Sequence, residues 1–274
     1  MNLKSFGLSD IGTSRANNED VWAAMPEIGF FALADGMGGP QAGEIAAKEA
    51  IHSLCDSVSK IKSYNCMELI IELRHAIEKA NQSIHEMGKT SKSLAGMGTT
   101  LCCLIWTQDA VVYAHVGDSR IYRLRHKKLD LLTQDHSLLA KWLATGKLAE
   151  ECKTPYPYKN VITRAIGTSS KAKPEIAVAT HEEGDLYLLC TDGLSDVLSI
   201  QEIEKIINRS PDLESGCKSL IERAKIKGSC DNITLLMIQQ MDSNGENLPR
   251  QQLNDDLRSE SIQSYASGSE RSPS

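Results

Sequence analysis

The sequence lacks the features that mark several large classes of protein. No stretch approaches the ~18 consecutive apolar residues that a membrane-spanning helix needs, and residues 1–10 contain no basic segment followed by an apolar one. There is no block rich in Lys and Arg, and 36 acidic residues outnumber 30 basic ones, so the positive surface of a nucleic-acid binder is not expected. We therefore expect a cytoplasmic protein that is neither exported nor integral to a membrane and does not bind nucleic acid.

Two residue spacings that mark redox or metal sites are missing as well. The eight cysteines form no C-x-x-C pair, and most lie in apolar runs, which predicts reduced, buried thiols. Their even number leaves disulfides as the less favoured alternative. The seven histidines are scattered without an H-E-x-x-H pair, which disfavours zinc.

The chain is long enough for one large domain followed by a tail. Its 274 residues, of which 41% are apolar, can bury a full core. From residue 242 onward Ser, Asn and Gln dominate and apolar residues are isolated. This composition predicts a folded domain over 1–241 and a disordered, Ser-rich polar tail over 242–274.

Apolar runs rich in β-branched and aromatic residues occur in blocks that are separated by segments of helical periodicity. This arrangement predicts an α+β fold with antiparallel sheets covered by helices. Turn residues at 108–109 and 117–119 predict two hairpins, and residues 145–160 predict an exposed flap. The predicted strands are 29–34, 99–107, 110–116, 120–124, 185–190 and 233–238, and the predicted helices are 41–58, 66–87, 137–143, 201–208 and 213–225.

Acidic residues stand at the ends of several predicted strands. In an antiparallel sheet the end of one strand lies beside the start of its neighbour, so such acids can collect at one edge. An Asp-Gly pair after a strand is most often only a turn, but a gathered set of carboxylates also suits Mg²⁺ or Mn²⁺. Spacing alone leaves both interpretations open. The acids that directly follow a strand are Asp35, Asp118 and Asp192, and those that directly precede one are Glu19, Asp20 and Asp231.

Six motifs in a fixed order carry a resemblance to a known family. Together they resemble the metal-dependent protein phosphatases of type 2C, the PPM family, over about residues 1 to 240. The form Asp-Gly-Met-Gly-Gly is typical of the bacterial members. The motifs are Ser9–Asp20 (SDIGTSRANNED), Ala34–Gly39 (ADGMGG), Gly98–Thr100 (GTT), Val116–Arg120 (VGDSR), Cys190–Asp196 (CTDGLSD) and Asp231–Thr234 (DNIT).

The resemblance implies an αββα sandwich, in which two antiparallel sheets are flanked by helices and two Mn²⁺ or Mg²⁺ ions lie at one edge. It also implies hydrolysis of phosphoserine and phosphothreonine by a metal-bridging hydroxide, without a phosphoenzyme. The implied substrates are phosphoproteins, a bacterial-type Ser/Thr kinase among them, and the expected state is a monomer.

The resemblance also assigns roles to individual residues. Asp35 would bridge the two ions, and Arg15 would grip the substrate phosphate, for which a guanidinium is well shaped. A surface salt bridge is the alternative for Arg15. The remaining implied ligands are Glu19 and the Gly36 carbonyl on one ion, Asp192 and Asp231 on the other, Asp20 as a nearby acceptor, and Asp118 with Asp196 on a third, weaker ion.

One position departs from the pattern of the eukaryotic members. Met37 stands where they commonly have a histidine that is proposed as the general acid. His136 is a possible donor instead, although a capping or packing role is favoured for it. A catalytically silent binding module and a nuclease-like hydrolase are the competing functions. The presence of every core ligand favours an active phosphatase over the first, and the lack of a basic channel disfavours the second.

Overall fold

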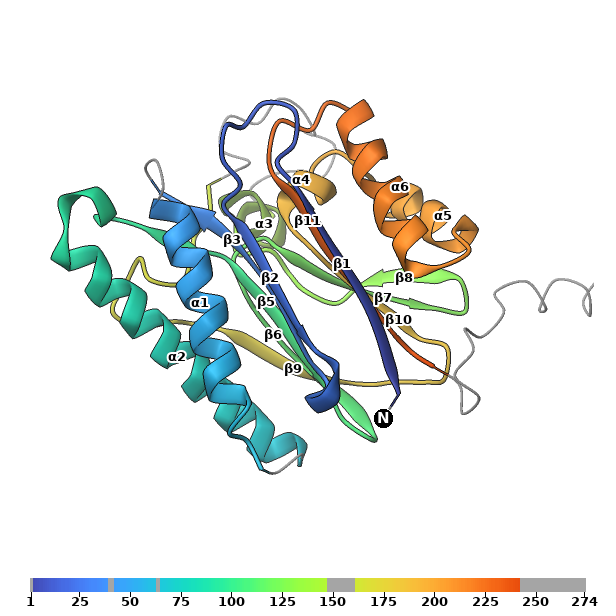
Figure 1. Cartoon of the computed structure of the whole chain (residues 1–274), viewed down its shortest axis with the longest axis horizontal. Helices are drawn as coiled ribbons and strands as arrows, with labels where there is room; N and C mark the ends of the chain where they lie inside the picture. The colour runs from blue at the N-terminus through green and yellow to red at the C-terminus, as the bar shows by residue number, and fades with distance from the viewer. Residues whose placement is uncertain (1, 39–41, 63–64, 147–160, 242–274) are drawn as a thin grey trace, which may run out of the picture.

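Two antiparallel sheets face each other between two pairs of helices in a computed structural model, which describes residues 2–38, 42–62, 65–146 and 161–241 (Figure 1). One sheet has the order β1 (Leu3–Asp10), β11 (Ile233–Gln240), β10 (Leu186–Cys190), β7 (Arg120–Arg125) and β8 (Lys128–Leu131). The other has the order β2 (Asp20–Met25), β3 (Phe30–Met37), β5 (Leu101–Trp106), β6 (Ala110–Val116) and β9 (Glu175–Thr180), with β4 (Gly98–Thr99) beside β3. The predicted αββα sandwich is confirmed.

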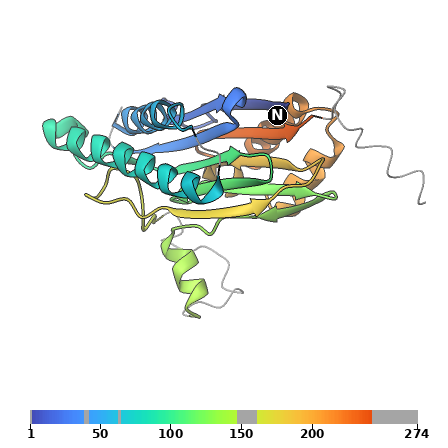
Figure 2. The ribbon, with the colours of Figure 1, turned by 90° about the horizontal axis from the view of Figure 1, so that it is seen from below.

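Each sheet has its own pair of covering helices (Figures 1 and 2). Helices α1 (Ala42–Val58) and α2 (Cys66–Thr90) cover the β2–β9 sheet, whereas α5 (Ile200–Arg209) and α6 (Leu213–Ile226) cover the β1–β8 sheet. The shorter helical elements are η1 (Pro26–Ile28), η2 (Lys92–Leu94), α3 (Leu138–Ala144) and α4 (Asp192–Ser195). Across the described residues, no helix combines the length and apolarity that crossing a bilayer requires.

The alternation of side chains along the strands divides the core into three layers. Along β3, Phe30 and Ala32 face the helices while Phe31 and Leu33 face the opposite sheet, because successive strand residues point to opposite faces. Both faces are therefore apolar, which explains why β3 and β5 read as continuous apolar runs.

The middle layer holds the two sheets together. It contains Trp106 and Tyr187, whose rings meet edge to face with their centroids 5.1 Å apart, a favourable arrangement for aromatic pairs. Its other buried members come from both sheets and are Phe31, Leu33, Cys102, Leu104, Val111, Ile121, Leu189, Leu236 and Ile238.

Local signals place the helix starts where the sequence predicts them. Asp212 caps α6 by accepting a hydrogen bond from the Ser215 N–H at 2.7 Å, and Ser199 forms a capping box with Glu202 at the start of α5. The α3 helix begins after Ser137, whose hydroxyl accepts from the Ala140 N–H.

One predicted turn is wrong. The turn at 108–109 does join the antiparallel pair β5 and β6, but residues 117–119 do not close a hairpin between β6 and β7. These two strands belong to different sheets, and Gly117, with φ of 105°, turns the chain from one sheet to the other. β6 is almost entirely buried and β7 is half-buried, and each packs within its own sheet.

The cysteines in the described part of the chain are free thiols, as predicted. Cys102, Cys103, Cys190 and Cys217 are buried, whereas Cys55 and Cys66 are only partly buried and Cys230 is exposed, contrary to the prediction of buried thiols. Cys152, most of the predicted flap and the predicted tail lie outside the described residues.

Candidate active site

The acidic residues of the sequence motifs meet at one edge of the sandwich. Asp20, at the start of β2, is the register partner of Asp35, near the end of β3. In the other sheet the end of β10 lies beside the start of β11, where the Thr191 N–H donates to the Thr234 carbonyl at 3.0 Å. This puts Asp192 beside Asp231 and Asn232. The predicted neighbourhood of strand ends and strand starts is therefore found in both sheets, at the upper edge in Figure 1 where α4 lies.

Two side chains connect the edges of the two sheets. The Thr191 hydroxyl, which follows β10, donates to Asp20 Oδ2 at 3.1 Å across the sandwich. The Asn232 side chain accepts from the Glu19 N–H at 2.9 Å and donates to the Ile11 and Asn17 carbonyls, both at 2.9 Å. These bonds hold the Glu19 and Asp20 segment against the start of β11.

Glu19 lies in a space that two glycines leave open. A Cβ atom at position 43, in the first turn of α1, would overlap the Glu19 carboxylate, and one at position 36 would overlap the Gly43 carbonyl. The Gly36 N–H also donates to the Glu19 carbonyl at 3.1 Å. The Gly36 backbone and the Glu19 carboxylate therefore lie within one small region, as the predicted shared ligation requires.

A threonine pair fixes the backbone at Asp35. Thr100 accepts from the Asp35 N–H through its hydroxyl at 3.0 Å, and its own N–H donates to the Asp35 carbonyl at 2.8 Å. The Thr99 hydroxyl donates to the same carbonyl at 2.8 Å. Thr100 also bonds the hydroxyl of Ser119 at 2.7 Å, which ties the Asp118 corner to β3.

The electrostatics of this edge are those of crowded, buried carboxylates. Burial and then the charges of Asp20, Asp192, Asp231 and Asp118 raise the pKa of Asp35 well above its usual range. The same two causes, burial first, raise the pKa of Asp192 to about 8, and burial raises the pKa values of Asp20 and Asp118 to about 6. Because each acid feels the others, the set forms one cluster without enough positive charge of its own.

The hydrogen-bond inventory indicates the same deficit. Asp20 Oδ1 and Asp192 Oδ1 are buried, and neither has a hydrogen-bond partner among the described residues. Among the described residues, the half-exposed Arg15 forms an ion pair with one of the clustered acids, and its Nη2 lies 2.7 Å from Asp231 Oδ2. An all-oxygen cluster with raised pKa values and unpartnered buried oxygens fits hard divalent cations such as Mg²⁺ or Mn²⁺.

A comparison with known proteins decides the family. The family model described as "Protein phosphatase 2C" matches residues 12–225. The chain belongs to the protein phosphatase 2C family. It is 34% identical over 250 residues to the protein phosphatase PhpP of Streptococcus pneumoniae, and this match covers 87% of the chain and 98% of the relative.

Two solved structures extend this likeness to the fold. The serine/threonine phosphatase PstP/Ppp of Mycobacterium tuberculosis is 32% identical, with a TM-score of 0.81 and coverage of 88% of this chain and 99% of that one. A catalytic domain of PstP in complex with two manganese ions is also 32% identical, with a TM-score of 0.77 and coverage of 86% and 97%. The chain is thus a protein phosphatase of the metal-dependent 2C type.

The remaining residues that the sequence predicts for the site lie around the same edge. Asp118 follows β6 and Asp196 ends α4, and the charge of Asp196 contributes to the raised pKa values of both Asp118 and Asp192. Sequence reasoning missed Thr99, Thr100, Thr191 and Asn232 as supports of the acids. A hydrogen bond between residues that are tens of positions apart leaves no local sequence pattern. The only signal for these four residues was their position inside the GTT, CTDG and DNIT motifs.

His136 is packed against His115 and Glu175. It is 6% exposed and stacks on His115 with ring centroids 4.5 Å apart. Its Nδ1 accepts from the Gly117 N–H at 3.2 Å, and its Nε2 lies 3.1 Å from Glu175 Oε1. Since Nδ1 accepts, the proton of the neutral ring is on Nε2 and is directed at Glu175. The packing role favoured from the sequence is therefore confirmed, although Ser137 rather than His136 caps α3.

The same hydrogen bonds argue against a second metal centre at this place. Ligand atoms of His115, His136 and Glu175 lie within 4.8 Å of one another. However, the His136 Nε2 proton lies where a metal would bind, and Arg164 Nη1 lies 3.0 Å from that nitrogen and 2.8 Å from Glu175 Oε1. A fixed guanidinium in this position opposes a further cation.

Proposed function

We propose that the protein dephosphorylates phosphoserine and phosphothreonine in proteins with two Mn²⁺ or Mg²⁺ ions held at the acidic edge, and that it reverses the action of a bacterial-type Ser/Thr kinase. The observation that carries this proposal is the gathering of acids from both sheets into one cluster, in which two buried carboxylate oxygens have no partner among the described residues. The two manganese ions in the PstP structure support the number and kind of ions.

The placement of the acids supports the ligand roles that the family resemblance implies. Asp35 has the charges of the other clustered acids around it and would be a ligand of both ions. Glu19 and the Gly36 carbonyl, which share the space beside Gly43, would hold one ion, and Asp192 and Asp231 the other. Asp118 and Asp196 would hold a third, weaker ion, and Asp20, supported by Thr191, would accept a hydrogen bond within the site.

Bound divalent cations supply a water acidic enough to attack phosphorus near neutral pH and positive charge to offset that of the phosphate. The chain itself would contribute orientation and charge. Arg15 is half-exposed and bonded through one nitrogen to Asp231. Its guanidinium would hold the phosphate oxygens, since a fork of N–H donors suits a phosphate. Thr99, Thr100, Thr191 and Asn232 would keep the acids in place.

We further propose that the catalytic domain ends near residue 241 and that residues 242–274 form a polar tail. The protein would act as a monomer in the cytoplasm, where a Ser/Thr kinase provides its substrates. Because His136 directs its proton to Glu175 and Met37 carries none, the leaving alkoxide would be protonated by water rather than by either side chain.

The test is phosphate release from a phosphothreonine peptide with Mn²⁺, with EDTA, and with Asp35→Asn. The matched control is Asp185→Asn, which alters a buried aspartate at the far end of β10. We expect release with Mn²⁺ in the wild type and in the control, and a loss of release in EDTA and in Asp35→Asn. Undiminished release in EDTA or in folded Asp35→Asn would refute the proposed function.

A further inference from the structure

A cavity of about 610 Å³ lies beside the acidic edge, between α3 and the segment that leads into β9. Figure 2 shows α3, drawn in yellow-green, projecting away from the sandwich. The cavity is lined by four cationic side chains and two acidic ones. The cations are Lys141, Arg164, Lys171 and Lys173, and the acids are Asp135 and Glu175. We call this cavity the lysine pocket.

Both acids of the lysine pocket are already matched by arginines. Asp135 receives two hydrogen bonds from Arg120, at 2.9 and 2.7 Å, and Glu175 pairs with Arg164 at 2.8 Å. These carboxylates are therefore not available to offset the lysines. Arg164 uses only Nη1 for these contacts within the described residues. Its guanidinium is held in place by Glu175, and its other N–H groups can donate to a ligand in the pocket.

The three lysines supply the excess positive charge. Lys141, Lys171 and Lys173 are exposed, and in the described ranges no carboxylate forms an ion pair with any of them. The chain as a whole carries a formal charge of −6. A local gathering of cations on an acidic protein points to an anionic ligand.

Short chains of hydrogen bonds connect the lysine pocket to the acidic edge. The Thr99 N–H donates to the Ile166 carbonyl, next to the pocket residue Ala165, while the Thr99 hydroxyl donates to the Asp35 carbonyl. On the other side, the His136 N–H donates to the Gly117 carbonyl at 2.8 Å, next to Asp118. An extended peptide advances ~3.3 Å per residue, so a few residues of a bound substrate suffice to reach from the edge into the pocket.

We propose that the lysine pocket binds an acidic or phosphorylated side chain of the protein substrate, a few residues away from the phosphoserine or phosphothreonine that is hydrolysed. This inference rests on the proposed function. The pocket would thus select substrates with negatively charged flanks. The flexible stems of the lysines allow several positions of the second anion, whereas Arg164 offers a fixed one. Free inorganic phosphate has the same chemistry and is the competing ligand.

The test compares two phosphothreonine peptides that differ only in having Glu or Gln on both flanks, with p-nitrophenyl phosphate as a substrate without flanks. The variant is Lys141→Gln combined with Lys171→Gln and Lys173→Gln. The matched control removes three equally exposed lysines from other places, as Lys60→Gln, Lys205→Gln and Lys218→Gln. We expect wild type and control to prefer the Glu peptide by about tenfold in kcat/KM at low salt, with the preference falling as KCl is added.

The pocket variant should lose this preference and keep the wild-type rate on p-nitrophenyl phosphate. Equal kcat/KM values for the two peptides in the wild type, with hydrolysis intact, would overturn the inference and leave the proposed function standing. No hydrolysis of any substrate would instead contradict the proposed function. If the pocket variant changed only inhibition by added inorganic phosphate, the pocket would take the free ion, and substrate docking would be overturned.

Discussion

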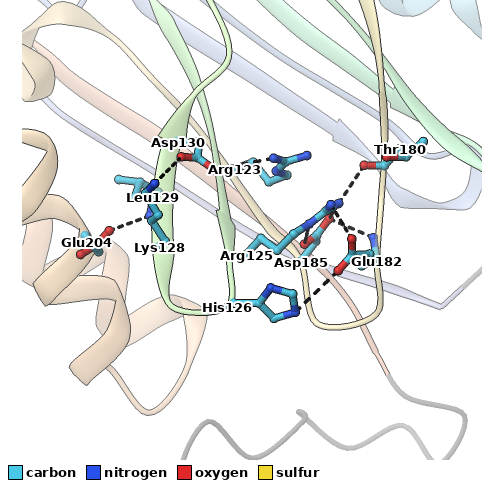
Figure 3. A network of polar contacts seen from close by, with 10 residues as sticks. All are labelled: Arg123, Arg125, His126, Lys128, Leu129, Asp130, Thr180, Glu182, Asp185 and Glu204. Carbon is cyan, nitrogen blue, oxygen red and sulfur yellow. Dashed lines mark hydrogen bonds and ion pairs between the residues drawn. The ribbon is translucent and has the colours of Figure 1, made fainter.

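Strand β10 has an aspartate at each end, and the two differ in their partners. Asp185, just before the strand, is 1% exposed and receives two hydrogen bonds from Arg125, at 2.9 and 2.7 Å, and one from the Glu182 N–H (Figure 3). Asp192, just after the strand, is half-buried, and its buried oxygen Oδ1 has no partner among the described residues. Burial and the charges of four other aspartates raise its pKa to about 8.

This difference separates a structural acid from one that needs an external cation. At the Asp185 end the chain supplies the cation itself, and Arg125 also reaches the Thr180 carbonyl and Glu182 (Figure 3). At the Asp192 end, Arg15 pairs with Asp231 on its exposed side, and Asp192 itself has no ion-pair partner among the described residues. A buried charge is tolerated only when it is paired or neutralised. We therefore propose that cations bind at this end.

The largest expected effect is on catalysis at the unpaired end. Asp192→Asn keeps the shape of the side chain and removes a charge that would bind a cation. We expect kcat/KM on a phosphothreonine peptide to fall by about 10³-fold, or about 4 kcal/mol of activation free energy, while the metal-free protein unfolds at an equal or higher temperature. If a folded Asp192→Asn protein had near wild-type turnover, Asp192 would not be part of the site.

Metal removal should make stability depend on pH in an unusual direction. The folded-state pKa values are raised, to about 6 for Asp20 and Asp118 and about 8 for Asp192. The folded protein then binds more protons than the unfolded one, so its stability falls as pH rises. In EDTA we expect a loss of about 3 kcal/mol of unfolding free energy between pH 5 and pH 8, measured by urea titration. Excess Mn²⁺ should abolish this loss, and a curve in EDTA that is flat or rises would contradict the electrostatics of the edge.

Breaking the paired end should affect stability and leave catalysis unchanged. In Asp185→Asn the half-buried Arg125 keeps Glu182 but loses its charged partner at position 185, which should cost roughly 2–3 kcal/mol of unfolding free energy. The kcat of the folded fraction and the response to Mn²⁺ should stay at wild-type values. A loss of Mn²⁺ activation in this variant would contradict the assignment of Asp185 as a purely structural acid.

Arg15 gives a smaller and more selective effect. Arg15→Lys keeps the charge but loses the fork of N–H donors, so we expect KM for a phosphothreonine peptide to rise by about tenfold without a change in melting temperature, because the ion pair with Asp231 is exposed. An unchanged KM, together with a lowered melting temperature, would make Arg15 a structural residue.

The smallest expected effect concerns the bond between the sheets. Thr191→Val removes the hydroxyl that donates to Asp20 and that accepts from the Thr234 N–H at 3.0 Å. We expect a loss of about 1 kcal/mol of unfolding free energy and a severalfold weaker Mn²⁺ activation. The control is Thr107→Val. Thr107 is also buried but lies directly after β5, so this substitution should affect stability alone.

Sequence reasoning could find the acids but not their supports. Asp35, Asp192 and Asp231 stand out because each lies at a strand boundary, and antiparallel pairing brings such boundaries together. The Thr191 bond to Asp20 spans 171 positions and has no local signature. Likewise, the turn at Gly117 looks like a hairpin from the sequence, because composition does not tell whether two successive strands share a sheet or lie in opposite layers. Whether two strands share a sheet depends on how the faces of both sheets pack, which is a property of the whole chain.

The most direct test of the central claim is the number of Mn²⁺ ions bound per chain, measured by equilibrium dialysis for the wild type, Asp35→Asn and Asp185→Asn. We expect at least two ions for the wild type and for Asp185→Asn, and fewer than two for Asp35→Asn. A wild-type protein that binds no Mn²⁺, or an Asp35→Asn protein that binds as many ions as the wild type, would contradict that claim.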